Sequence, residues 1–255
     1  MSTEALEKVT ICETPKLKSF LPIMHCTGCH YGMIIRIICE TVEELDIGGR
    51  TILLGGVGCS YAWPMMFNLD GAACPHGRAP AMATALKRIH PENILITCQG
   101  DGDLGAIGLG CFMNALVRGE KLTTIFLNNA GYGMTGGQMA PTTLLGQVTT
   151  TTPEGRDREA AGYPLHVAEL AATMKGVAYS ARVTVHTPAN YTKAKKAVKL
   201  ALQKQIYGIG YSFVEFLSAC PAAWRMDPKE CIAFINDEMV PEYPLGEFKN
   251  VERID

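Results

Sequence analysis

The sequence predicts an α/β protein with a mostly parallel sheet and helices on both of its faces. Apolar runs of strand length alternate with segments of helical periodicity along nearly the whole chain. The runs carry few polar residues, which is typical of parallel strands buried on both faces. Glycine is also abundant, with 26 residues in 255, and this suits close packing of helices on a sheet. Without an internal repeat or a low-complexity linker, one domain over residues 1–255 is expected.

Each element follows from a local pattern. Met33, Ile34, Ile37, Ile38, Val42 and Leu45 repeat at helical spacing, Pro91 follows the end of one expected helix, and Pro188 begins another. Helices are expected over residues 31–46, 78–90, 105–118, 164–174, 188–208 and 228–239. Strands are expected over residues 51–57, 93–97, 123–127, 178–185 and 211–217. An irregular arm (1–24), a Thr-rich loop (140–153) and a C-terminal tail (240–255) complete the chain.

Composition limits the function classes. The net charge of −2 gives no sign of a nucleic-acid-binding or membrane-surface protein, and the lysines over residues 193–199 fit the solvated face of a helix. Glu4, Glu7 and Lys8 interrupt any signal-peptide pattern, and no apolar run could span a bilayer, so we expect a cytoplasmic protein. Ten cysteines in such a chain favour a metal cluster or an oxygen-poor cell over a disulfide framework.

Two polar turns follow neighbouring expected strands. Gly100-Asp101-Gly102-Asp103 comes after the strand at 93–97, and a turn from Asn128 to Thr135 comes after the strand at 123–127. The carboxyl ends of parallel strands share one edge of a sheet, so the two turns can converge there. A carboxylate and an amide oxygen are hard ligands suited to Mg²⁺ beside a diphosphate. The first turn alone would be weak evidence, because such turns follow many strands.

The cysteines fall into two groups. Cys26 and Cys29 form a C-x-x-C pair, which suits a zinc half-site, a redox pair or an iron–sulfur half-site. Cys59 and Cys220 each follow an expected strand, and the alternative is that they are small buried hydrophobic residues. Cys74, which also precedes a proline, is a rival ligand. The others are Cys39, Cys98 and Cys111, expected in the core, and Cys12 and Cys231, which have no partner pattern.

The paired turns resemble the metal–diphosphate motif of thiamine diphosphate enzymes. That resemblance implies that Mg²⁺ is held by Asp101, the Asn129 side chain and the Gly131 carbonyl oxygen. Most of the chain also resembles the thiamine-binding β subunit of the 2-oxoacid:ferredoxin oxidoreductases. The matching stretches are Cys26-Thr27-Gly28-Cys29, Gly58-Cys59-Ser60, His76-Gly77-Arg78-Ala79, Gly100 to Asp103, Asn129 to Gln138 followed by Pro141-Thr142-Thr143, and Cys220-Pro221 with Trp224.

The resemblance implies a thiamine diphosphate-binding fold and three bound groups: thiamine diphosphate, Mg²⁺ and one 4Fe–4S cluster on Cys26, Cys29, Cys59 and Cys220. The implied reaction is oxidative decarboxylation of a 2-oxoacid to its acyl-CoA, with coenzyme A as co-substrate and ferredoxin as electron acceptor. The implied coenzyme-binding residues are Cys59, Ser60, Gly100, Asp101, Gly102, Asp103, Asn129, Gly131, Met134 and Thr135. One departure is Cys29-His30-Tyr31, where the family usually has Cys-Gly-His.

Further residues and partners follow from the same resemblance. His76 and Arg78 are catalytic candidates beside the diphosphate or the substrate carboxylate, although Arg78 could simply begin a helix with His76 in its capping turn. The Glu that contacts the aminopyrimidine ring is expected from an α subunit, so the isolated chain should be inactive. A γ subunit, a ferredoxin-like δ subunit and an external ferredoxin are the other expected partners.

Two alternative functions stay open at this point. One is a thiamine-dependent 2-oxoacid decarboxylase subunit without a cluster, and the other is a zinc-stabilised assembly subunit. A nucleotide-binding Rossmann protein is disfavoured, because no G-x-G-x-x-G opens a helix after the first strand. Within the resembled family, the small size of the chain and the segment from Thr142 to Asp157 are most similar to subunits that act on branched-chain 2-oxoacids or 2-oxoglutarate. Of these two, we favour the branched-chain (2-oxoisovalerate) type.

Overall fold

The computed structural model describes residues 13–254. Within them the strands form one seven-stranded sheet in the order β2-β1-β3-β4-β6-β5-β7. Neighbouring strands pair in parallel except β7, which runs antiparallel to β5. The strands are β1 (Thr51–Gly55), β2 (Asp70–Ala73), β3 (Ile94–Gly100), β4 (Thr123–Asn128), β5 (Val177–Thr184), β6 (Tyr211–Leu217) and β7 (Gly246–Asn250). The predicted α/β class with a mostly parallel sheet is confirmed.

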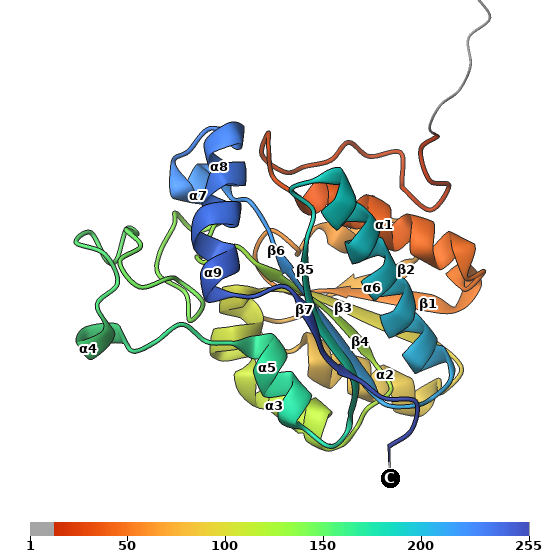
Figure 1. The fold of residues 1–255 in the computed structure, drawn as a ribbon. Helices are drawn as coiled ribbons and strands as arrows, with labels where there is room; N and C mark the ends of the chain where they lie inside the picture. The colour runs from red at the N-terminus through yellow and green to blue at the C-terminus, as the bar shows by residue number, and fades with distance from the viewer. Residues whose placement is uncertain (1–12, 255) are drawn as a thin grey trace, which may run out of the picture.

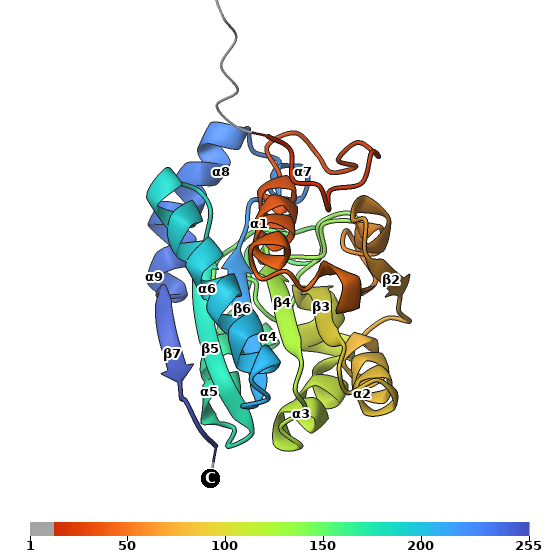
Figure 2. The same cartoon turned by 90° about the vertical axis from the view of Figure 1, so that its right-hand side faces the viewer.

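Helices cover both faces of the sheet (Figures 1 and 2). One face carries α1 (Tyr31–Glu44) and α6 (Pro188–Ile206), and the other carries α2 (Ala79–Ile89), α3 (Leu109–Val117) and α5 (Val167–Thr173). Successive strand residues point to opposite faces, so both faces must be apolar for a sheet buried in this way. In β4, Ile125 and Leu127 pack toward α1 and α6, whereas Phe126 packs on Phe213 on the other side.

Short elements surround the carboxyl end of the sheet. The C-terminal group is α7 (Pro221–Trp224), α8 (Pro228–Phe234), the π-helix η4 (Ile235–Met239) and α9 (Val240–Glu242). It packs a separate apolar cluster against Ala130, Leu144 and Leu217. A long segment that contains α4 (Arg158–Ala161) projects from the body (Figure 1). The remaining single turns are η1 (Gly48–Arg50), η2 (Trp63–Met66) and the π-helix η3 (Gly102–Ile107).

An ion-pair ladder joins α1 to α6 across their exposed sides. Lys195 Nζ lies 2.7 Å from both Glu40 Oε2 and Glu44 Oε1, and Lys199 Nζ lies 2.8 Å from Glu44 Oε2. Hydrogen bonds from Lys195 and Arg36 lower the pKa of Glu40, although burial acts in the opposite direction. The lysines expected on a solvated face therefore include two that fix the packing of these helices.

The expected elements are present, with several differences. The helix predicted over residues 228–239 is divided into α8 and the π-helix η4. The helix predicted near 105–118 is divided, because the π-helix η3 begins directly after β3 and α3 follows it. The edge strands β2 and β7 were not predicted, since both are short, largely exposed and free of an apolar pattern. β7 occupies part of the segment expected as a C-terminal tail. Residues 13–24 are mostly irregular as expected, whereas residues 1–12 lie outside the described part of the chain. None of the helices over residues 13–254 is long and apolar enough to cross a membrane.

Candidate active site

A cavity opens where the strand order reverses, at the carboxyl ends of β1 and β3. From β1 the chain goes on to β2 on one side, and from β3 it goes on to β4 on the other. Ligands of parallel α/β sheets gather at such a point, because the loops after the two strands diverge there. The cavity is lined by Tyr31, Val57, Gly58, Cys59, Ser60, His76, Gly100, Asp101, Gly102, Asp103, Asn129, Gly131, Tyr132, Gly133, Met134 and Thr135.

Asp101 lies at the floor of this cavity with 2% of its surface exposed. Its Oδ1 accepts a hydrogen bond from the Gly102 N–H (3.0 Å), and its Oδ2 accepts from the Gly131 N–H (3.0 Å) and the Thr142 hydroxyl (2.9 Å). Burial nevertheless raises the pKa of Asp101 to about 6, because it removes more hydration than these donors replace. A bound cation would supply the missing compensation.

The side chain of Asn129 turns its oxygen toward other oxygens. It lies 3.1 and 3.3 Å from the two Asp101 carboxylate oxygens and 2.8 Å from the Gly131 carbonyl oxygen. Turning the amide over would replace this repulsion with hydrogen bonds from its nitrogen. A cation bound between the oxygens would also remove this repulsion. Ligands of octahedral Mg²⁺ lie about 2.0–2.1 Å from the ion, so neighbouring oxygens are about 2.9 Å apart. With the amide in this orientation, the spacing of the oxygens fits such an ion.

Asp103 differs from Asp101 in that donors of this chain occupy its carboxylate. Oδ1 accepts from the Val57 N–H (3.0 Å), the Gly77 N–H (2.8 Å) and His76 Nδ1, and Oδ2 accepts from Gln99 Nε2. Asp103 thus joins the loops after β1 and β2 to the turn after β3. Because Nδ1 of His76 faces a carboxylate, it carries the proton in the neutral ring, which leaves Nε2 as the ring's second polar atom.

The remaining predicted residues divide by location. Ser60 lies in the cavity wall, and its buried hydroxyl has no hydrogen-bond partner within the described part of the chain. Met134 is 64% exposed at the cavity mouth, and the Thr135 hydroxyl donates to Gln138 Oε1 (2.8 Å). Arg78 lies outside the cavity lining, and its guanidinium donates to Cys111 Sγ (3.0 Å). Of the predicted residues near the diphosphate, only Arg78 is not brought to the cavity.

Cys26, Cys29, Cys59 and Cys220 lie close enough to influence one another electrostatically, and Cys59 lines the same cavity. Burial is the main factor that raises the pKa of Cys29 to about 12, and nearby Cys220, Cys59 and Cys26 each raise it further. Burial raises the pKa of Cys220 to about 12 as well. A Cβ atom at Gly133 would lie 2.8 Å from Cys220 Sγ, so the turn after β4 approaches this thiol closely. Over residues 13–254, no three His, Cys, Asp or Glu side chains converge on a single ion.

The other cysteines lie elsewhere. Cys39, Cys98 and Cys231 are fully buried, and Cys74 is buried with its sulfur 3.4 Å from that of Met82. Cys111, expected in the core, is partly exposed. Cys12 falls outside the described residues.

Thr142 is a site residue that the sequence analysis did not assign. It lies in the Pro141-Thr142-Thr143 stretch, which carried the resemblance but no role, and its hydroxyl reaches Asp101 across 41 positions of sequence. Trp224, from α7, is similar: its indole N–H donates to the Asn129 carbonyl oxygen (2.9 Å). Only their place in a matching motif could have drawn attention to either.

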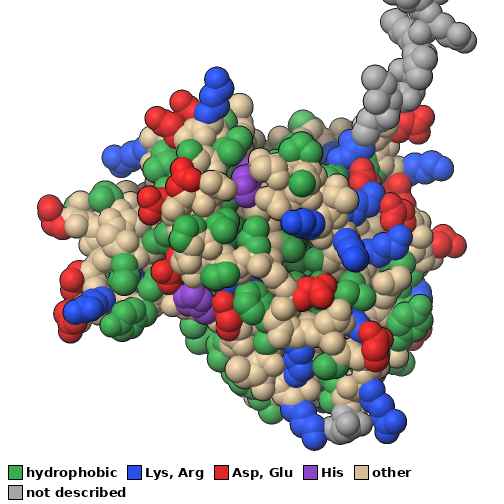
Figure 3. All heavy atoms as spheres, viewed as in Figure 1, with side chains coloured by type: hydrophobic (Ala, Val, Ile, Leu, Met, Phe, Trp, Pro, Cys, Tyr) green, Lys and Arg blue, Asp and Glu red, His purple; other side chains and the backbone are tan. Residues whose placement is uncertain are grey.

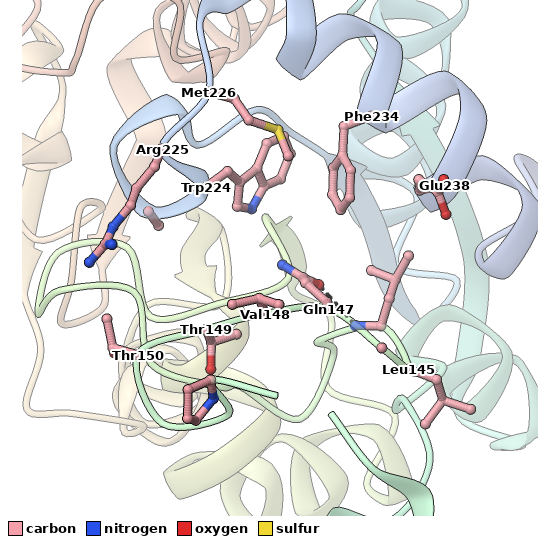
Figure 4. A pocket seen from close by; sticks show the side chains of 14 residues that line it. Leu145, Gln147, Val148, Thr149, Thr150, Trp224, Arg225, Met226, Phe234 and Glu238 are labelled. Carbon is pink, nitrogen blue, oxygen red and sulfur yellow. Dashed lines mark hydrogen bonds between the residues drawn. The ribbon is translucent and has the colours of Figure 1, made fainter. Parts of the chain in front are cut away.

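Trp224 also forms one wall of a larger, mainly apolar cavity of about 790 Å³ between residues 144–153 and the α7–α8 segment (Figure 4). Its ring lies 4.7 Å from that of Phe234, and Met226 lies beside both (Figure 4). The thioether, the indole and the phenyl ring face Val148 and Gln147 across the opening. Trp224 therefore links this cavity to the turn that carries Asn129.

Residues 56–215 match the family model described as "Thiamine pyrophosphate enzyme, C-terminal TPP binding domain". The chain belongs to this family. Ketoisovalerate oxidoreductase subunit VorA of Methanothermobacter marburgensis is 43% identical over 226 residues, which are 89% of this chain and 47% of that protein. The chain therefore spans about half the length of this relative.

Two shorter relatives match over most of their own length. 2-Oxoglutarate synthase subunit KorB of Archaeoglobus fulgidus is 34% identical, with 85% of this chain and 77% of that protein covered. KorB of Methanocaldococcus jannaschii is 33% identical, with 91% and 89% covered. The chain thus belongs with the 2-oxoacid oxidoreductase subunits of the family, which confirms the resemblance found in the sequence.

A solved structure has the same fold. 2-Oxoglutarate:ferredoxin oxidoreductase from Magnetococcus marinus, with 2-oxoglutarate, coenzyme A and succinyl-CoA bound, superimposes with a TM-score of 0.74. The match covers 98% of this chain and 89% of the other, at 24% sequence identity. At 24% identity, this similarity shows that the two chains share a fold, and it carries no conclusion about function.

Proposed function

We propose that this chain is the subunit of a 2-oxoacid:ferredoxin oxidoreductase that binds thiamine diphosphate, Mg²⁺ and one 4Fe–4S cluster. The complex would convert a 2-oxoacid and coenzyme A to an acyl-CoA and CO₂, pass the electrons to ferredoxin, and be able to run in reverse. The main support is the group of oxygens from Asp101, Asn129 and Gly131 at the spacing of Mg²⁺ ligands, next to four cysteines.

The residues around this group fit a diphosphate. Asp101, Asn129 and the Gly131 carbonyl would hold the ion, and the unpartnered Ser60 hydroxyl is available as a donor. Gly102 lets the chain pass close to Tyr132, since a Cβ atom there would lie 2.0 Å from the Tyr132 ring. Backbone N–H groups of such glycine-rich turns can approach phosphate oxygens.

Cys26, Cys29, Cys59 and Cys220 would bind the cluster. A cubane takes one thiolate on each of four irons, so its ligands surround it and do not converge on one ion. The raised pKa values of Cys29 and Cys220 favour protonated thiols without metal, and metal binding would replace these protons. When bound, thiamine diphosphate would supply a carbanion nucleophile for a keto carbon, and the cluster would supply a one-electron acceptor beside it.

His76 is the ionisable group of this chain that we assign to the open side of the cavity. Asp103 fixes its orientation through Nδ1, so Nε2 would face a phosphate oxygen or a substrate carboxylate, as a donor when protonated. Asp103 itself would act mainly by holding the surrounding loops, because its oxygens already accept from this chain. We expect Arg78 to contribute less, since it lies outside the cavity lining.

The site would be completed by another polypeptide. The cavity encloses about 90 Å³, against about 300 Å³ or more for typical small-molecule sites. Tyr61, Met65 and Met134 are 52%, 59% and 64% exposed near its mouth or on the adjoining loop, which suits burial by a partner. We propose an α subunit that supplies the pyrimidine-ring Glu, with γ and ferredoxin-like δ subunits. The VorA relatives support a branched-chain 2-oxoacid as substrate.

The test is anaerobic purification of the complex, followed by assays of thiamine diphosphate, magnesium, iron and acid-labile sulfide. We expect one thiamine for each copy of this chain, and four irons in addition to those of the ferredoxin-like δ subunit. Cys26→Ser should lower the iron content, whereas Cys74→Ser, at a buried position outside the cysteine group, should leave it unchanged. Thiamine without iron would indicate the decarboxylase subunit, and zinc without thiamine would indicate the assembly subunit.

A further inference from the structure

A line of polar side chains crosses the sheet to the turn after β4. It begins at Glu169 on α5, whose Oε1 accepts a hydrogen bond from Arg182 Nη1 on β5 (2.8 Å). Arg182 Nε lies 3.0 Å from Glu215 Oε2 on β6, where the two residues are direct neighbours in the β5–β6 pairing. Glu215 Oε1 accepts from Asn128 Nδ2 at the end of β4 (2.7 Å). The line therefore joins a helix and three strands.

The centre of this line is fully buried. The side chains of Arg182 and Glu215 are both 0% exposed. The guanidinium carbon of Arg182 lies 5.1 Å from the centre of the Tyr243 ring and 5.0 Å from the centre of the Phe248 ring. Burial acts to lower the pKa of Arg182, but Glu215 and Glu169 outweigh it and raise the pKa. A buried ion pair is a costly way to gain stability, since apolar residues of similar volume often serve as well. This arrangement suggests that the pair has another role.

That role becomes apparent at Asn128. Because its amide nitrogen donates to Glu215, its Oδ1 must face the other way, where it accepts from the Ala130 N–H (3.1 Å). Such a bond from a side chain to the backbone two residues on folds the chain into a tight turn. Ala130 takes the left-handed conformation there, with φ of +54°, which is unfavourable for a residue other than glycine.

The turn points the Asn129 side chain and the Gly131 backbone at Asp101. The Gly131 N–H donates to Asp101 Oδ2, and the Asn129 oxygen faces the same carboxylate. The Ala130 carbonyl oxygen accepts from the Thr143 hydroxyl (2.8 Å), which holds the turn from the opposite side. Asn128 thus determines the direction of the two groups that would bind the metal with Asp101.

We propose that Asn128, oriented by Glu215 and Arg182, is a positioning residue that sets the affinity of this chain for Mg²⁺–thiamine diphosphate. The proposal rests on the proposed function. Asn128 would contact neither the ion nor the coenzyme. It holds Ala130 in the left-handed conformation, and its amide can do so only while the buried carboxylate of Glu215 keeps it from turning over.

The experiment measures the Kd of Mg²⁺–thiamine diphosphate for the assembled complex by calorimetric titration. Asn128→Ala should weaken binding about 10–100-fold, as is usual when the support of a metal ligand is removed. Thr123→Val is the matched control, because Thr123 is a fully buried residue of the same strand that donates to the Gln205 side chain at the other end (2.8 Å). It should lower the thermal stability similarly and leave the Kd unchanged.

Two further variants separate positioning from loss of stability. Glu215→Gln keeps the shape, but its amide oxygen should turn to Arg182 and its NH₂ to Asn128, which would turn the Asn128 amide over. It should weaken binding although it lies outside the cavity. Adding Ala130→Gly to Asn128→Ala should restore a large part of the affinity, since glycine takes a positive φ without support.

The outcomes distinguish the two proposals. If the wild-type complex bound no thiamine diphosphate, the proposed function would fail. If it bound the coenzyme and Asn128→Ala bound equally well, the positioning role would be wrong. It would also be wrong if Thr123→Val weakened binding as much, or if Ala130→Gly restored no affinity. Because Glu215→Gln preserves the side-chain volume, it provides the test if Asn128→Ala does not fold.

Discussion

Replacing Asp101 by Asn should stabilise the metal-free protein at neutral pH while it removes metal binding. Asp101 is buried, and its pKa is raised from 3.8 to about 6. Its ionised form is therefore less stable in the folded chain than in the unfolded one. Asparagine has the same shape without the charge, so the substitution removes this destabilisation together with a ligand of the proposed Mg²⁺ site.

The magnitude follows from the shift in pKa. Each unit is worth about 1.4 kcal/mol, so the carboxylate destabilises the folded chain by about 3 kcal/mol at pH 7. An Asn oxygen can still accept from Gly131 and Thr142, but its nitrogen would face the Gly102 N–H and lose that bond, at a cost of about 1 kcal/mol. The expected net gain at pH 7 is about 2 kcal/mol.

The sign of the effect should change with pH. A raised carboxyl pKa destabilises the fold above that pKa, and the destabilisation disappears as the pH falls toward the unfolded value of 3.8. At pH 4 it is about 0.5 kcal/mol, so the lost hydrogen bond should make Asp101→Asn slightly less stable than wild type. The measurement is urea unfolding of chelator-treated protein at both pH values. A variant that was less stable at pH 7, or equally affected at both, would refute the reasoning.

Three other predictions concern the projecting segment that contains α4, the α1–α6 ion pairs and the cysteine group. Arg156→Met removes five hydrogen bonds to backbone carbonyls, and amide exchange should accelerate over residues 141–163 by the equivalent of about 2–4 kcal/mol while the sheet stays protected. Lys195→Met should lower the free energy of unfolding by up to about 1 kcal/mol at pH 7. The difference from wild type should shrink as the pH falls through the lowered pKa values of Glu40 and Glu44, so denaturant unfolding should show a smaller difference at pH 3 than at pH 7. Gly133→Ala places a Cβ atom 2.8 Å from Cys220 Sγ and should reduce the iron content, whereas Gly49→Ala, with open space around it, should not.

Much of the fold could be predicted because the buried strands are continuous apolar runs. The runs at 123–127 and 211–217 became β4 and β6 with nearly the expected bounds. The edge strands were not predicted, because a strand exposed on its outer side needs no apolar pattern. β2, for example, consists of Asp70, two alanines and a glycine. The π-helix η3 also escaped prediction, since it depends on how the turn after β3 meets the cavity.

The sequence by itself determined the chemistry available to this protein: which oxygens and thiols follow the strands, and that the ends of parallel strands bring them to one edge. Tertiary structure alone decided how these groups are oriented. Thr142 reaches Asp101 across 41 residues, and Asn128 meets Glu215 across 87. Local patterns encode the period of a helix or strand, whereas the direction of a buried amide depends on a hydrogen-bond partner that the chain supplies from a distant strand.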